Sequence, residues 1–105
     1  MSRTRLELLD EMIAKGTTDP FVYYARALEL RADGALEAAL AGLTDLRART
    51  PSYVPTYLMA GQVAETLGRA EVARDFLAAG IEVARAAGDT RALSELRAAL
   101  DALEP

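Results

Sequence analysis

Acidic residues that lie close together in the sequence are the first candidates for chemistry in this chain. Asp10 is followed directly by Glu11, and Glu71 precedes Asp75 by four residues. Paired carboxylates can act as general acid and base, but adjacent residues on a helix point apart. Glu71 and Asp75 flank Arg74 on a surface that we expect to face solvent. Neither pair is therefore predicted to be catalytic.

The side chains that most often serve as bases, nucleophiles and soft metal ligands are missing. The sequence contains no histidine and no cysteine, which excludes imidazole chemistry, thiolate metal sites and disulfides. Lys15, the single lysine, lies at a predicted helix end, so no nucleophile has a base beside it. The Gly-Arg-Ala-Glu turn that begins at Gly68 follows no strand and is not a phosphate-binding loop. We predict a protein that is not an enzyme and needs no cofactor or metal.

Composition points to one helical domain. A chain of 105 residues is long enough for one hydrophobic core, so we expect a single domain over residues 1–105. Hydrophobic residues make up 51% of the sequence, but many are alanine, a strong helix former. Alternating apolar and polar runs, the mark of half-buried strands, do not occur. We therefore predict an all-α fold.

The charge pattern excludes several classes of partner. The formal net charge is −4, and the arginines are interleaved with acidic residues, so we expect no nucleic-acid partner. No apolar run approaches the ~20 residues needed to cross a membrane. The amino terminus does not resemble a signal peptide, because acidic residues interrupt its apolar stretch. A cytoplasmic protein with no membrane partner is the expectation.

Apolar spacing and turn residues divide the chain into helices. Asp19 is placed as an N-cap with Pro20 at the first helical position, while Gly16, Gly34 and Gly88 follow apolar-periodic stretches as stops. The predicted helices span residues 3–15, 20–33, 35–49, 53–67, 69–87 and 90–103.

Two consecutive helix pairs share one pattern at a shift of 34 residues. Each pair has an aromatic residue, a small residue four positions later, a glycine at the turn, and then an alanine and a leucine in the second helix. The matching residues are Tyr23 and Tyr57, Ala27 and Gly61, Gly34 and Gly68, Ala39 and Ala73, and Leu43 and Leu77. Over residues 20–87 the chain resembles the tetratricopeptide repeat, whose period is about 34 residues. The resemblance implies a right-handed α-solenoid of antiparallel helix pairs, about six helices in all.

The repeat register assigns a role to each part of the chain. Residues 20–51 form the first repeat and residues 52–87 the second, and residues 1–16 correspond to the second helix of a preceding repeat. Residues 89–105 form a capping helix, because Glu95 and Ala102 stand where a third repeat would need a small residue and a turn. On the first helix, we expect Leu8 and Met12 to pack on the next two helices. The alternative for these two residues is a dimer interface.

In proteins of this family, the first helix of each repeat lines a concave groove. The resemblance places eight residues there: Phe21, Tyr24, Leu28, Arg31, Pro55, Leu58, Gln62 and Glu65. It implies a module that binds a protein or peptide partner in this groove, with Phe21 and Tyr24 as anchor residues. Family members that clamp the terminal carboxylate of a chaperone use lysine and asparagine, whereas this chain has Tyr24, Leu28 and Met59. Self-association through an exposed apolar helix face, giving a homodimer, is the alternative function.

Removal of the residues after Gly88 is expected to leave an insoluble or molten protein. The predicted cap buries four leucines at about 1.5–3 kcal/mol each, a large share of a net stability of about 5–15 kcal/mol. Open helical stacks also need such an end to cover their last apolar face. Gel filtration and thermal unfolding followed by circular dichroism test this expectation. A soluble truncated chain with a cooperative transition would contradict it.

Overall fold

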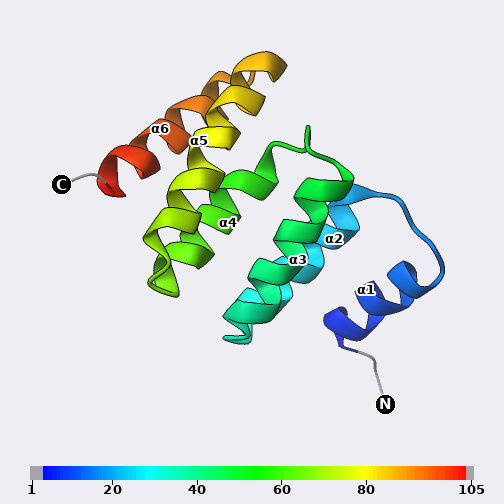
Figure 1. Ribbon diagram of the computed structural model, residues 1–105. Coiled ribbons are helices and arrows are strands. Elements are labelled where there is room, and N and C mark those ends of the chain that lie inside the picture. Colours follow the sequence, from blue (N-terminus) through cyan, green and yellow to red (C-terminus); the bar gives the residue numbers. More distant parts are fainter. Residues whose placement is uncertain (1–3, 104–105) are drawn as a thin grey trace.

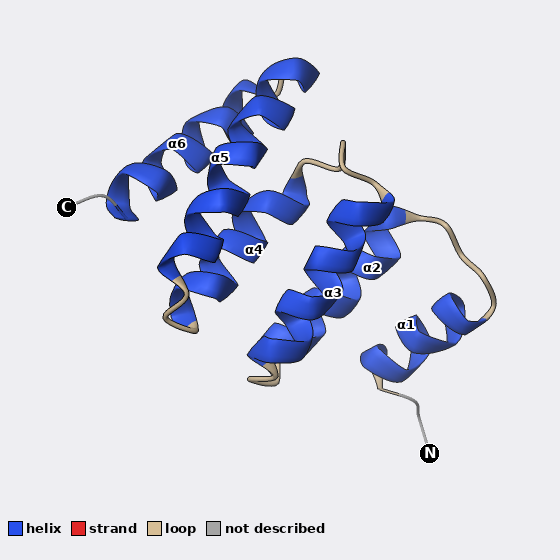
Figure 2. Cartoon of the chain, viewed as in Figure 1, coloured by secondary structure: helices blue, strands red, loops and turns tan. Residues whose placement is uncertain are grey.

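The computed structural model describes residues 4–103, which form six α-helices and no strand (Figures 1 and 2). The predicted all-α fold is confirmed. The helices are α1 (Arg5–Ala14), α2 (Pro20–Ala32), α3 (Leu36–Arg49), α4 (Pro55–Thr66), α5 (Ala70–Ala87) and α6 (Thr90–Leu103).

Local side chains determine where several helices begin and end. The Asp19 carboxylate accepts a hydrogen bond from the Phe21 N–H at 3.0 Å, as the sequence predicted for an N-cap. The Thr4 hydroxyl accepts from the Glu7 N–H at 3.1 Å and completes a capping box at α1, which was not predicted. Gly34 and Gly68 follow the first helix of each pair with φ of 80° and 77°, a conformation that glycine adopts without strain.

The helices form an elongated stack in which each packs against its neighbours in sequence (Figure 1). In addition, α2 contacts α4 and α4 contacts α6, so these three helices lie in one layer of the stack. The stack measures 48 × 29 × 20 Å along its principal axes. This is the arrangement of a helical repeat, because each element contacts only near neighbours along the chain.

The hydrophobic core runs through five of the six helices. Its largest fully buried side chains include Leu43 of α3, Tyr57 of α4, Leu77 of α5 and Leu96 of α6. A smaller cluster joins α1 to α2 through Leu9, Val22 and Ala25, with Ile13 packed against it. Two helices, α4 and α6, pack against α5.

Close approach of α4, α5 and α6 depends on two glycines. A Cβ atom at Gly80 would lie 2.4 Å from the Cβ of Tyr57 and 3.0 Å from Cδ2 of Leu96. A Cβ at Gly61 would lie 2.6 Å from Cδ2 of Leu77. Carbon–carbon distances of 2.4 and 2.6 Å are shorter than any normal contact. The helices α4 and α5 can therefore pack this closely only because positions 61 and 80 lack a side chain.

The prediction for Leu8 and Met12 is wrong. Their side chains are 48% and 46% exposed, because α1 packs on α2 alone and does so through another face. At the 34-residue shift, Met12 corresponds to Leu46, which is buried in α3. The difference has a simple cause: α3 packs between α2 and α4, whereas no described helix lies on the other side of α1.

Two large side chains lie partly at the surface, and one helix boundary differs from the prediction. Leu36 is only partly buried. Val72 of α5 is 39% exposed. The fourth helix begins at Pro55, two residues later than predicted, with Val54 as its N-cap.

Replacement of Gly80 by alanine is expected to lower the free energy of unfolding by about 1–3 kcal/mol, because the added methyl group overpacks the Tyr57 contact. Gly42, in α3, is the matched control, since a Cβ there meets only Nη1 of Arg26 at 3.8 Å. Gly42→Ala is expected to raise the free energy of unfolding by about 0.5–1 kcal/mol through helix propensity. Urea denaturation measures both, and equal effects of the same sign would contradict the steric explanation.

Candidate binding groove

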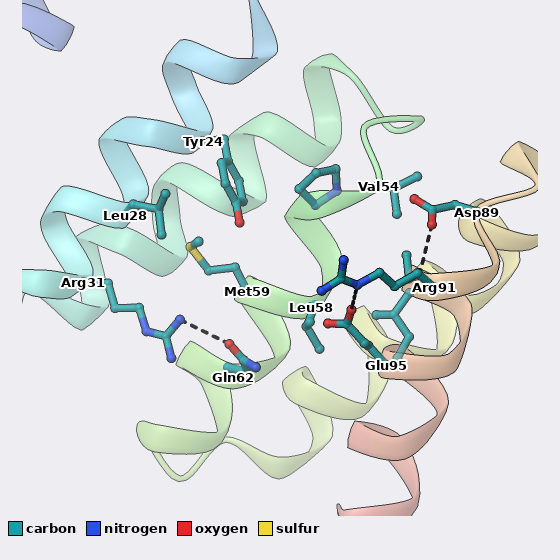
Figure 3. Close-up of a pocket in the computed structure, with 13 residues that line it drawn as sticks. Tyr24, Leu28, Arg31, Val54, Leu58, Met59, Gln62, Asp89, Arg91 and Glu95 are labelled. Carbon is teal, nitrogen blue, oxygen red and sulfur yellow. Dashed lines mark hydrogen bonds and ion pairs between the residues drawn. The ribbon is translucent and has the colours of Figure 1, made fainter.

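A groove of about 350 Å³ lies between α2, α4 and α6 (Figure 3). These helices form one layer of the stack, and each contributes side chains to the groove. The lining residues are Tyr24, Leu28 and Arg31 of α2; Val54, Pro55, Leu58, Met59 and Gln62 at or in α4; and Asp89, Arg91, Ala92, Glu95 and Leu96 at or in α6.

The middle of the groove is apolar and contains one aromatic ring. The Tyr24 side chain meets Tyr53 edge-on, with ring centroids 5.9 Å apart and planes at 67°. Burial raises the pKa of the Tyr24 phenol above its ordinary value, an effect that the nearby Arg31 charge partly offsets. The phenol therefore stays neutral at physiological pH. Leu28, beside it, is 39% exposed, so a large apolar side chain faces the open groove.

Polar side chains lie at both ends of the groove (Figure 3). On the α2 side, Nη1 of Arg31 donates to Oε1 of Gln62 at 3.2 Å. On the α6 side, Nε of Arg91 pairs with Oε1 of Glu95 at 3.2 Å. The Asp89 carboxylate accepts from the Ala92 N–H at 3.0 Å and caps α6. An apolar centre with a few placed polar groups is the usual character of a binding site.

The chain is similar to solved structures of a tetratricopeptide repeat domain protein from Salinibacter ruber. The solution structure is 41% identical with a TM-score of 0.79, and the match covers 83% of this chain and 88% of that one. The crystal structure is 42% identical with a TM-score of 0.78, and covers 82% and 96% of the two chains. This chain belongs to the tetratricopeptide repeat family.

A further structure, of a protein from Bordetella parapertussis, shares the fold. It is 24% identical with a TM-score of 0.82, and the match covers 97% of this chain and 89% of that one. No family model matches the chain, and no curated protein sequence matches it. The resemblance to tetratricopeptide repeats that the 34-residue pattern suggested is thus confirmed by comparison of structures.

Six of the eight residues that the repeat pattern places in the groove lie in its lining. They are Tyr24, Leu28, Arg31, Pro55, Leu58 and Gln62. Phe21 and Glu65 do not line it. Phe21 lies one turn before Tyr24 and is 47% exposed, and Glu65 lies one turn after Gln62. Both are on helices that form the groove but are not among its lining residues. The first helix, α1, contributes no lining residue, so it does not close the groove.

No residue of α6 was predicted to line the groove, because residues 89–105 were expected to form a capping helix. The repeat register contained the missing signal. A further shift of 34 residues from Pro55, Leu58 and Gln62 gives Asp89, Ala92 and Leu96, and all three line the groove. In this tetratricopeptide repeat protein, α6 thus occupies the position that the first helix of a third repeat would have.

Neither a cluster of metal-ligating side chains nor a membrane-spanning helix is found among the described residues. Within residues 4–103, no three acidic side chains come together as metal ligands could. None of the six described helices has the length and apolar character needed to cross a bilayer.

Proposed function

We propose that this protein binds a segment of a partner protein in the groove between α2, α4 and α6. Membership of the tetratricopeptide repeat family supports a general role as a protein–protein interaction module. The observation that carries the specific proposal is the apolar centre of the groove, where Tyr24, Leu28 and Leu58 face a space that no helix of the described chain fills. An extended peptide or a helix would bury these side chains and gain free energy from doing so.

The aromatic residue is the expected anchor of binding. Tyr24 already packs against Tyr53, so its side chain is held in place before the partner arrives. Aromatic side chains often dominate binding energy because they bury a large area at a low cost in conformational entropy. The neutral phenol of Tyr24 can also donate a hydrogen bond to a backbone carbonyl of the bound segment.

Leu28→Asp is expected to weaken partner binding by at least about tenfold, because it places a charge in the apolar centre of the groove. Val72→Asp is the matched control. Val72 and Leu28 are both 39% exposed, but Val72 lies on α5 and outside the groove. Affinity capture from a lysate of the source organism, with both variants checked for wild-type helicity, compares the partners retained. Loss of the same partners from both variants, or from neither, would contradict groove binding.

A second candidate function is self-association through α1. The observation that favours it is the exposure of Leu8 and Met12, which lie one helical turn apart on a face that no described helix covers. Two large apolar side chains at this spacing form a short stripe suited to another helix.

If α1 mediates self-association, the wild-type protein will form dimers as its concentration rises, and Leu8→Glu, Met12→Glu will remain monomeric. Each glutamate would place a charge in the interface, and removing that charge from water would cost more free energy than the apolar contact gains. Sedimentation equilibrium over a wide concentration range measures this difference. Leu28→Asp serves as the control and is expected to dimerise like the wild type. A monomer at every concentration would exclude this function.

A further inference from the structure

Arg31 hydrogen-bonds to a neutral partner, whereas most arginines of the described chain pair with carboxylates. Seven arginines form ion pairs with carboxylates: Arg5 with Glu29, Arg26 with Asp10, Arg47 with Asp75, Arg49 with Asp45, Arg69 with Glu37, Arg85 with Glu82 and Arg91 with Glu95. Arg31 instead donates to the neutral amide of Gln62, and no acidic residue among residues 4–103 pairs with it. Arg31 is partly buried, which makes a missing counter-charge more costly than on an open surface.

The position of Arg31 makes this difference relevant to binding. Its side chain lines the groove one turn after Leu28, and the bond to Gln62 joins the α2 and α4 walls (Figure 3). A guanidinium has five N–H donors and keeps its charge at any physiological pH, so one bond to an amide leaves most of its capacity unused. The Gln62 amide holds the guanidinium in place but does not neutralise it.

The two ends of the groove differ in charge. The α2 end has the guanidinium of Arg31 without a carboxylate, while the α6 end has the carboxylates of Asp89 and Glu95 with the one guanidinium of Arg91. A bound segment with a negative charge near one end would therefore be favoured in one direction along the groove.

We propose that the groove binds an amphipathic segment in which an acidic side chain pairs with Arg31 and a neighbouring apolar side chain packs on Tyr24, Leu28 and Leu58. This inference rests on the proposed function and names the chemical class of its partner. A guanidinium and a carboxylate form paired, charge-assisted hydrogen bonds, which specify the ligand more sharply than an apolar surface does. The negative charge comes from a side chain and does not require a chain terminus.

Selection from a random peptide library tests the charge preference directly. The peptides are displayed on phage and fused at their carboxyl ends, so that only side chains can supply a carboxylate. The targets are the wild-type chain, Arg31→Glu and Arg97→Glu. Arg97 is the matched control, because it is an exposed arginine of α6 with no ion pair among the described residues and lies outside the groove.

Wild-type protein and Arg97→Glu are expected to enrich peptides with aspartate or glutamate beside an apolar residue. Arg31→Glu is expected to lose these peptides and to enrich lysine or arginine at that position. With the best peptide synthesised, replacement of its acidic residue by the matching amide should weaken binding to the wild type roughly fivefold to tenfold. The same replacement should have no effect on binding to Arg31→Gln, which completes a double-mutant cycle.

The outcomes separate this inference from the proposed function. Peptides that lose binding to Leu28→Asp but show the same charge preference on wild type and Arg31→Glu would overturn the role of Arg31 and leave groove binding intact. Peptides that bind Leu28→Asp as well as the wild type, or a library that yields no binders, would contradict both. Enrichment of uncharged peptides similar to the exposed face of α1 would overturn the inference in favour of a second copy of this chain.

Discussion

The contact between Tyr57 and Gly80 determines how the second half of the stack is built. The Cβ of Tyr57 lies only 2.4 Å from the place that a Cβ at position 80 would take, and Leu96 of α6 closes the same space. Three helices therefore meet around one glycine. Because α6 packs against α4 and α5 in this way, the first turns of α6 reach the groove and form the third wall of the groove.

Tyr57 is also held by contacts with α3 and with the loop that follows it. Its hydroxyl donates to the Pro51 carbonyl at 2.5 Å, and the Arg47 guanidinium lies 5.5 Å from its ring and 5.1 Å from that of Phe76. These contacts link α3, the following loop, α4 and α5. In the first repeat, the Tyr23 hydroxyl donates to the Thr17 carbonyl at 3.0 Å, also six residues earlier. The repeated tyrosine thus fixes the entry to its helix in both copies, with an arginine over the ring in each.

The groove follows from the same packing. Leu28 of α2 is exposed at the groove, whereas Tyr24 lines the groove and also packs against the core. Residues of α4 and α6 continue this surface at the repeat spacing. Small residues at the helix contacts keep the layer tight, while larger ones at the lining positions leave apolar surface in contact with water. Such surface is costly for a protein that works alone, so it supports a role in binding. The unpaired charge of Arg31 adds a polar requirement to an otherwise unspecific apolar site.

The sequence by itself determined the helices, their turns and the repeat. Gly34 and Gly68 mark equivalent turns, Asp19 and Pro20 mark a helix start, and the tyrosine, small-residue and leucine positions recur at a fixed shift. These features act within one or two helical turns, and local backbone preferences and apolar periodicity are enough to specify them. The same register also located six of the thirteen residues that line the groove, because residues one repeat apart point in the same direction.

Only the tertiary structure decided which side chains stay exposed and which polar groups find partners. Leu8 and Met12 have the spacing of core residues, but they are exposed because α1 has a single neighbour. Phe21 has the type of an anchor residue but does not line the groove. Arg31 looks like ten other arginines in the sequence, and its isolation from carboxylates appears only once α2 and α4 are side by side. Burial and ion pairing depend on contacts between residues far apart in the chain, and local patterns do not specify those contacts.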